Sequence, residues 1–185
     1  PKPLAEDGQT NNRPLPEYNL PRKWELTGPV SPKIPLIQFH FLAPLERYAG
    51  EVRKAKGQLE LAANGTIQKG AFTVDVTSLT MGMESFDTRV LKSYVKAKKH
   101  PESSFLCQEV RLAEPLAWGR TSQATINGDF KMLGKTRTVQ MNAILVPTID
   151  ETGQPVMIVQ ADFELNITDL FGVKGPDGPD PAKKT

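Results

Sequence analysis

The sequence predicts an all-β fold, a meandering antiparallel barrel or sandwich of seven or eight strands that carries a single helix. Most of the chain after residue 34 alternates apolar and polar residues, which is typical of strands with one buried face. One segment, around residues 85–99, instead repeats its apolar residues at helical spacing. A small closed barrel either fills its interior with side chains or holds one apolar ligand. Whether the interior is filled with side chains or holds an apolar ligand therefore decides the function.

The composition predicts one domain, argues against a nucleic-acid-binding protein and excludes an intrachain disulfide. A chain of 185 residues is long enough to bury a core of its own. Its 23 basic and 21 acidic residues give a net charge of +2, too balanced to favour nucleic acid as a partner. The single cysteine, Cys107, excludes an intrachain disulfide. The chain starts at Pro1 and not at Met, which leaves the removal of a signal segment open.

The two ends of the chain differ in composition from the middle. Proline is dense at both ends, and it opposes helices and central strands alike. We therefore expect a Pro-rich tail and lead-in segment over residues 1–33, a barrel domain over 34–174 and a second tail over 175–185. Trp24 is too apolar to sit comfortably in water, so the lead-in is expected to lie along the barrel as irregular chain. The alternative is that the lead-in segment is simply part of the tail and does not lie along the barrel.

Short turns separate the expected strands. Asn64-Gly65 is a strong hairpin signal, because both positions of a tight hairpin turn require positive φ. Leu133-Gly134-Lys135 and the segment 150–153 are expected to turn the chain again. A closed meander would also protect the strand edges. The alternating segments are 37–42, 58–61, 66–67, 72–77, 105–108, 124–132, 139–145 and 157–167.

The segment from about residue 85 to 99 is predicted to form one amphipathic helix between two strands. Ser85 or Asp87 is expected to cap its start, and Pro101 stops it. The simpler interpretation of its basic side is a solvated surface, and the other is a surface that docks on anionic membrane during lipid exchange. The apolar stripe consists of Phe86, Val90, Leu91, Tyr94 and Val95, and the opposite side carries Arg89, Lys92, Lys96 and Lys99.

Four segments resemble motifs of the YceI-like proteins, a lipocalin-like group of bacterial polyisoprenoid-binding barrels. Phe72-Thr-Val-Asp-Val-Thr-Ser-Leu79 is similar to a family strand that ends before a loop. The segment from Asp87 through Lys99-His100-Pro101 to Phe105 matches the family in spacing. The hairpin from Ile126 to Val139 and the weaker match at 165–172 complete the resemblance.

The chain departs from the family pattern at three positions. Phe86 stands where the family usually has arginine, and Arg89 stands where it often has histidine. Leu170 is inserted between the aspartate and the phenylalanine of the last motif. None of these changes disturbs a barrel, but they prevent the transfer of individual ligand contacts from the family.

The resemblance implies an eight-stranded antiparallel lipocalin-like β-barrel that holds a long apolar chain, such as a polyisoprenoid or an isoprenoid quinone. It also implies a periplasmic or secreted protein that acts as a carrier or store and needs no cofactor other than this lipid. The sequence leaves a homodimer open. The residues expected to line the barrel, each of which could equally be ordinary core, are Phe39, Phe41, Phe72, Val74, Phe105, Ile126, Phe130, Met141, Leu145, Val159 and Phe163.

Two other classes of function remain open on the sequence. An enzyme would have to use a small set of candidates, which are Asp87, His100, Ser103, Ser104 and Cys107. Cys107 shares its strand face with Phe105, which indicates a buried and inert thiol, and no catalytic motif or metal-ligand spacing appears. We therefore expect no enzyme and no metal. A partner-binding or structural barrel with a packed interior is the other alternative, and it predicts an apolar patch on the outer surface.

Overall fold

The structure is a computed structural model that describes residues 20–26, 28, 36–42 and 47–173. The tail expected at 175–185, and the part of the tail and lead-in segment expected at 1–33 other than residues 20–26 and 28, therefore lie outside the described residues. Within the described ranges, two antiparallel sheets account for most of the chain.

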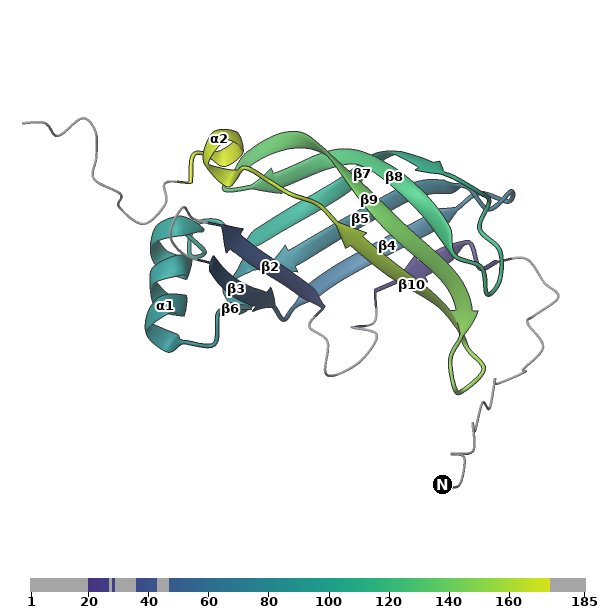
Figure 1. The fold of residues 1–185 in the computed structure, drawn as a ribbon, viewed down its shortest axis with the longest axis horizontal. Helices are drawn as coiled ribbons and strands as arrows, with labels where there is room; N and C mark the ends of the chain where they lie inside the picture. Colours follow the sequence, from purple (N-terminus) through teal and green to yellow (C-terminus); the bar gives the residue numbers. More distant parts are fainter. Residues whose placement is uncertain (1–19, 27, 29–35, 43–46, 174–185) are drawn as a thin grey trace, which may run out of the picture.

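The larger sheet has seven antiparallel strands and curls into a nearly closed barrel (Figure 1). Strands that follow one another in the sequence are neighbours over most of this sheet, as expected for a meander. In order across the sheet, the strands are β1 (Lys23–Glu25), β4 (Ala55–Leu61), β5 (Ile67–Asp75), β7 (Glu102–Leu112), β8 (Ser122–Met132), β9 (Lys135–Ile149) and β10 (Pro155–Asp162).

A second, three-stranded sheet lies beside the helical end of the barrel (Figure 1). It consists of β2 (Ile37–Leu42), β3 (Arg47–Val52) and β6 (Leu79–Thr80), in the order β2-β3-β6. The prediction of an all-β antiparallel barrel with one amphipathic helix is confirmed. The described strands divide into seven and three, where the family resemblance implied eight in one barrel.

Part of the lead-in segment is a regular strand and not irregular chain. In β1, Trp24 pairs with Leu59 of β4. Two backbone hydrogen bonds extend the pairing: Leu61 N–H donates to the carbonyl of Arg22, and Leu26 N–H donates to the carbonyl of Gly57, both at 2.8 Å. The expectation that Trp24 would lie along the barrel is confirmed, and the pairing explains why.

The three predicted turns are present. Leu133 and Gly134 have φ values of 53° and 74°, so a tight two-residue hairpin joins β8 to β9. Between β4 and β5 only Gly65 has a positive φ, 79°, and the loop spans residues 62–66, where Ala62 N–H donates to the carbonyl of Thr66. The chain turns at Asn64-Gly65 as predicted, but the two-residue turn expected there is wrong. Asp150 organises the turn between β9 and β10, where its carboxylate accepts hydrogen bonds from the backbone amides of Thr152 and Gln154.

The helix begins as predicted but ends earlier. α1 (Glu84–Arg89) continues into a π-helical turn, η2 (Val90–Tyr94), and the chain then turns at Lys96 with a φ of 48°. The prediction of a helix up to residue 99 is therefore wrong. The wider turn places Val90, Val95 and Ala97 together in the core, which an α-helix continued through residue 97 would not do.

Neither predicted cap closes the helix in the usual way. Met83 occupies the N-cap position without a side-chain hydrogen bond. The Asp87 carboxylate instead reaches back to the preceding loop, where it accepts hydrogen bonds from Met81 N–H at 2.5 Å and from Thr80 Oγ1 at 2.6 Å. Asp87 thus fixes the loop to the helix, and Ser85 does not cap it.

The last predicted strand is also too long. β10 ends at Asp162, and residues 167–171 form a short helix, α2 (Ile167–Phe171). Asn166 caps its start by accepting a hydrogen bond from Asp169 N–H, and Gly172 ends it with a φ of 71°. This local cap and stop prevail over the alternation of Leu165 and Ile167 that the sequence shows.

The buried side chains form two groups. The barrel cluster fills the larger sheet and consists of Leu61, Phe105, Leu116, Ala124, Ile126, Val139, Met141, Ala143 and Leu145. The helix cluster lies at the helical end and consists of Val52, Val76, Leu79, Val90, Val95 and Ala97. A further 3-10 turn, η1 (Val76–Ser78), carries the chain from β5 into β6 within the helix cluster.

Candidate ligand-binding site

The strand register identifies the inner face of the barrel. Leu145 of β9 is 1% exposed and lies directly opposite both Ser122 of β8 and Val159 of β10. Residues directly opposite in antiparallel strands point to the same side of the sheet. Val159 therefore faces inward, as does every second residue along β10.

The structure places most of the predicted lining residues on this inner face or packed against it. Phe105, Ile126, Met141 and Leu145 are buried members of the barrel cluster. Phe72 and Phe130 are half-buried against it. That these residues line a bound ligand stays a prediction.

The other predicted lining residues have different surroundings. Phe39 and Val74 pack against the helix cluster and so belong to the helical end of the barrel. Val159 is 42% exposed and Phe163 is 43% exposed. The side chain of Phe41 lies outside the described residues.

Aromatic rings lie close to glycines in the barrel wall. Gly57 is paired directly with Phe72, and a Cβ atom at Gly57 would come within 3.0 Å of the Phe72 ring. The Phe105 ring takes the corresponding space at Gly128 of the neighbouring strand. A ring that covers a glycine fills space beside the wall, and small barrels alternate small and large inner residues in this manner.

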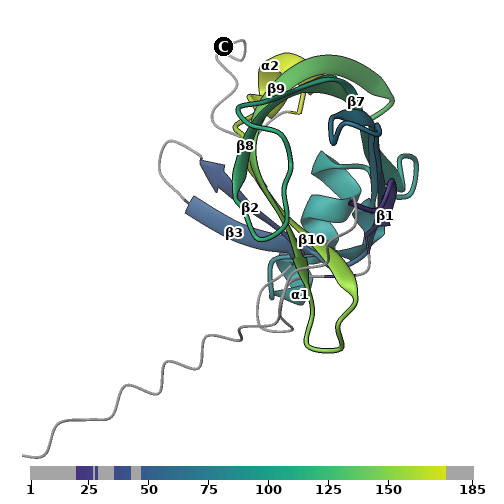
Figure 2. The same ribbon diagram turned by 90° about the vertical axis from the view of Figure 1, so that its right-hand side faces the viewer.

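The helix covers one end of the barrel. Figure 2 looks along the barrel from the opposite end, and the helix lies behind the ring of strands. The helix cluster, to which the helical segment contributes Val90, is packed against residues of three strands: Phe39 of β2, Val74 of β5 and Met132 of β8. Val90 is 2% exposed and Val95 is 3% exposed. The helical segment therefore lies across one end of the barrel (Figure 2).

A loop covers the opposite end, where the β4–β5 and β9–β10 hairpins lie (Figure 1). Between β7 and β8 the chain folds back and inserts Leu116, 7% exposed, into the barrel cluster. Two hydrogen bonds hold this loop in place: Gly119 N–H donates to the carbonyl of Pro147, and Ser122 Oγ donates to the carbonyl of Glu114. A small recess of about 220 Å³ remains beside it, lined by Leu20, Arg22, Ala62, Ala63, Asn64, Gly65 and Leu116.

The side of the barrel at β10 is less covered than its two ends. β1 and β10 are the two edges of the larger sheet and do not pair with each other in the described part of the chain. Val159 and Ala161 face inward from β10 and are both exposed, whereas Leu145 and Ala143, directly opposite on β9, are buried. The inner apolar surface therefore continues without a break from the buried core to an exposed strand edge.

A group of three phenylalanines extends this surface toward α2. Phe130 of β8 contacts Phe163 and Phe171 edge to face, with ring centroids 6.2 Å and 5.7 Å apart. Phe171 is buried and Phe163 is exposed. Phe163 therefore leaves a partly uncovered aromatic surface at the open side.

The candidate catalytic residues do not form a reactive group. Burial raises the pKa of the Cys107 thiol, as expected for an inert cysteine. Its Sγ packs against Gly70 in the barrel wall, whereas His100 lies beside Gly134 in the β8–β9 turn. Cys107 lies five residue steps along extended β7 from Glu102, about 17 Å of strand, so His100 and Cys107 cannot act together.

The remaining candidates serve local structure. Ser103 Oγ donates a hydrogen bond to the carbonyl of Lys131 across β7 and β8, and Asp87 holds the loop before the helix. In the described ranges, no three His, Cys, Asp or Glu side chains group as a metal site would require. None of the helices described has the length and apolar character needed to cross a bilayer.

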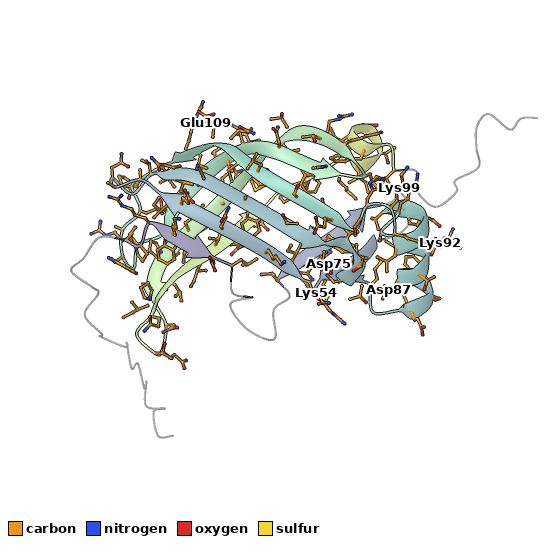
Figure 3. All side chains as sticks on the ribbon, turned by 180° about the vertical axis from the view of Figure 1, so that it is seen from behind. Lys54, Asp75, Asp87, Lys92, Lys99 and Glu109 are labelled. Atoms are coloured by element: carbon orange, nitrogen blue, oxygen red, sulfur yellow. The ribbon has the colours of Figure 1, made fainter. Side chains whose placement is uncertain are left out.

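The basic side of the helix is exposed as predicted. Lys92 and Lys99 lie at the helical end of the molecule (Figure 3). Arg89, Lys92, Lys96, Lys98 and Lys99 are all exposed. This end therefore carries a cluster of positive charge outside the helix cluster.

The predicted lining set omits several residues that lie on the inner face or in the barrel cluster. Leu59, Leu61, Val139, Ala143 and Met157 fall in segments that alternate apolar and polar residues, so the sequence carries a signal for them. Trp24 and Leu116 lie in segments without strand periodicity, so their place in the barrel follows only from the folded chain. The additional inner-face residues are Trp24, Leu59, Leu61, Val110, Leu112, Leu116, Val139, Ala143 and Met157.

Comparison with solved structures shows the same fold in another protein. The YceI protein of Campylobacter jejuni superposes with a TM-score of 0.57 at 14% sequence identity, over 78% of this chain and 79% of that one. BcnA of Burkholderia cenocepacia matches at 19% identity over 56% of this chain and 70% of its own, with a TM-score of 0.45. No curated protein sequence matches this chain significantly.

A polyisoprenoid-binding domain from Saccharophagus degradans is also similar, at 9% identity over 59% of this chain and 60% of its own, with a TM-score of 0.45. That similarity is too low to support an argument about ligands. The model of the YceI-like domain, in contrast, matches residues 32–180, which is most of the sequence. This chain belongs to the YceI-like domain family.

Proposed function

We propose that this protein binds a long apolar lipid, a polyisoprenoid or an isoprenoid quinone, inside its barrel and acts as a carrier or store for it. The observation that carries the proposal is the inner apolar surface that runs from buried Leu145 to exposed Val159. A soluble protein gains nothing from leaving an inner core surface exposed, whereas a lipid would cover it. The family membership supports the same class of function.

The driving force for such a complex is the removal of hydrocarbon from water. Each methylene group buried contributes about 0.8 kcal/mol, so an isoprenoid tail needs no polar contact to bind tightly. The inner aromatic and aliphatic side chains supply an apolar wall of the required kind. Polar contacts are needed only to orient the head of the lipid.

The lipid enters the barrel from the side, next to β10. The helix covers one end and the β7–β8 loop covers the other, while Val159, Ala161 and Phe163 stay exposed along the edge. A chain arriving there would contact apolar side chains throughout its path to Leu145. No helix or loop of the described chain would need to unfold.

We place the protein in the periplasm or outside the cell, where a lipid carrier would meet a membrane surface. The exposed lysines of the helix would then contact anionic lipid head groups through charge attraction, at about 1 kcal/mol for each residue near the surface. Such a contact is transient because it buries little apolar area.

Extraction of the purified protein tests the proposal. The protein is purified without detergent from a bacterium that makes isoprenoid lipids, extracted with organic solvent and analysed by mass spectrometry. A stoichiometric isoprenoid lipid is expected. A matched sample of the Ala143→Trp variant, in which a large ring fills the inner face at a buried alanine, should contain far less lipid. Equal amounts in both samples would argue against an internal ligand.

A second candidate function is binding of a protein partner, with a homodimer as its simplest form. On the outer face next to the same edge, Ile144 is 41% exposed and Ile158 is 36% exposed. Edge strands with outer apolar residues favour association with another chain. Sedimentation of the native protein and of the Ile144→Lys and Ile158→Lys double variant distinguishes the two cases. A dimer that dissociates in the variant would support this candidate.

A further inference from the structure

The indole of Trp24 buries a hydrogen-bond donor to which no described residue offers an acceptor. Its Nε1 atom is shielded from solvent and has no hydrogen-bond partner in the described ranges of the chain. Natural structures leave few such groups, because a buried donor without an acceptor loses its bond to water and gains nothing in return. A group that is lacking its partner in the free protein is a candidate to meet that partner in a complex.

Trp24 faces the interior of the barrel. It lies directly opposite Leu59, which in turn lies opposite Gly70, where the Leu59 side chain occupies the space over the glycine. Both Trp24 and Leu59 are half-buried and pack against the barrel cluster. The indole therefore faces the barrel interior, and a lipid oxygen reaches the covered Nε1 atom by displacing the side chains that pack on it in the free protein.

The position of the ring is well fixed by its strand. Hydrogen bonds on either side of Trp24, from Leu61 N–H to Arg22 O and from Leu26 N–H to Gly57 O, hold β1 in register with β4. A slip that would turn the indole outward would break both bonds and place Trp24 on the other face. The fold thus retains the buried donor although other registers would expose it.

We propose that Trp24 Nε1–H donates a hydrogen bond to an uncharged oxygen, a carbonyl or a hydroxyl, of the lipid bound in the barrel. This inference rests on the proposed function and adds the class of head group and its orientation. The oxygen is uncharged because an anion at this apolar wall would be desolvated without a buried cation to compensate it. Arg22, two residues earlier on the same face, is exposed in the recess at the hairpin end.

The position of Trp24 also sets the direction of the lipid. Leu59, its partner, lies near the end of β4 that leads into the Asn64-Gly65 hairpin. The oxygen-bearing head therefore lies toward the hairpin end, and the apolar tail extends toward Phe105, Phe130 and the helix. A quinone or a prenyl alcohol has both the oxygen-bearing head and the apolar tail, whereas a pure hydrocarbon has only the apolar tail.

The test removes the N–H group and keeps the shape of the ring. Trp24 is replaced by 3-benzothienylalanine, which has sulfur in place of the N–H, and in a second variant by phenylalanine. The control is Trp118→Phe, at the second of the two tryptophans in the chain. Displacement of 1-anilinonaphthalene-8-sulfonate gives the dissociation constants of decylubiquinone, geranylgeraniol, geranylgeranyl diphosphate and squalene, and thermal unfolding gives the stability of each lipid-free protein.

The benzothienyl variant should bind decylubiquinone and geranylgeraniol about five- to tenfold more weakly than the native protein, as expected for the loss of one hydrogen bond. Its affinity for squalene should stay within about twofold, because squalene has no acceptor. Its lipid-free form should be at least as stable as the native protein, since it no longer buries an unpaired donor. A donor with a purely structural role would instead lower stability and leave all four affinities equal.

Other outcomes overturn the inference in distinct ways. If the native protein binds the probes and the benzothienyl variant binds all of them equally well, the donor has no role and the proposed function stands. A larger loss for the diphosphate than for the alcohol would contradict the uncharged oxygen. If the native protein binds none of the four, the proposed function fails and the inference fails with it.

Discussion

At the scale of single residues, the inner face separates side chains that the fold buries from side chains that it leaves uncovered. Leu145 and Val159 are direct neighbours across two strands, yet one is 1% exposed and the other 42%. The buried side chain of Leu145 stabilises the fold, whereas the side chain of Val159 is only partly buried and contributes less to stability. The exposed part of Val159 is apolar surface that a ligand would cover. Substitutions at these two positions should therefore affect different properties.

Leu145→Ala should strongly destabilise the protein. Removing a fully buried leucine side chain lowers the free energy of unfolding by about 2–5 kcal/mol, because hydrophobic contacts are lost and a cavity is left. Leu106→Ala is the matched control, since Leu106 is 52% exposed on the outer face and its loss should cost less than about 0.5 kcal/mol. Urea unfolding measures both, and equal effects would mean that the barrel cluster is wrongly assigned.

Cys107 should react slowly with alkylating reagents in the folded protein. Burial raises its pKa, so the reactive thiolate is a smaller fraction of the thiol at any mildly alkaline pH than in the unfolded chain. Labelling by iodoacetamide should accelerate by more than about tenfold when urea unfolds the protein. A rate that is the same in both states would show an exposed thiol with an ordinary pKa.

At the scale of elements, β10 and the helical segment have separate tasks. β10 is an edge strand whose inner residues stay exposed, so it suits the passage of a lipid. The helical segment buries Val90, Val95 and Ala97 at one end and presents lysines outward. The helical segment therefore closes one end of the barrel, and the function proposed above adds membrane contact for this segment and lipid access for β10.

A charge on the inner face of β10 should slow lipid uptake. Val159→Lys places an ammonium group on the path to Leu145, and uptake should be on the order of tenfold slower, since about 1.4 kcal/mol added to a barrier lowers a rate tenfold. Ile158→Lys introduces the same charge at the adjacent residue, which faces outward and has a similar exposure. Stopped-flow binding of decylubiquinone compares the two, and equal slowing would place the access route elsewhere.

The lysines in the helical segment and in the turn that follows it should provide the attraction to anionic membranes. Replacing Lys92, Lys98 and Lys99 by glutamine should weaken binding to phosphatidylglycerol vesicles by about a hundredfold at low salt, at about 1 kcal/mol per charge. The same change at three exposed lysines of the barrel wall, Lys23, Lys56 and Lys69, is the control and should have a much smaller effect. Vesicle co-sedimentation with no difference between the triple variants would remove the helix from the proposed contact.

Sequence patterns predicted those elements that depend on local chemistry. The Leu133-Gly134 turn and the inner face of β9 follow from φ requirements and from a period of two. At Asn64-Gly65 the glycine alone has a positive φ, so the pattern predicted the place of the turn but not its length. The end of the helix was missed because the positive φ at Lys96 is imposed by the burial of Val95 and Ala97, a tertiary effect. For the same reason, the exposure of Val159 was not predictable, since alternation assigns a face but not the partners that cover it.

At the scale of the whole molecule, the barrel has two covered ends and one uncovered side. Leu116 and the β7–β8 loop cover the hairpin end, and the helix covers the other (Figure 2). The apolar interior is thus shielded from water along most of its surface but is reachable next to β10. This arrangement suits a protein that holds a hydrocarbon chain and releases it without unfolding.

A crystal structure of the protein purified without detergent from an isoprenoid-producing bacterium tests the central claim most directly. The account predicts elongated electron density inside the barrel, in contact with Leu145, Phe105 and Val159, with an oxygen-bearing end near Trp24. An interior filled by side chains alone, with Val159 and Phe163 covered by protein, would contradict it.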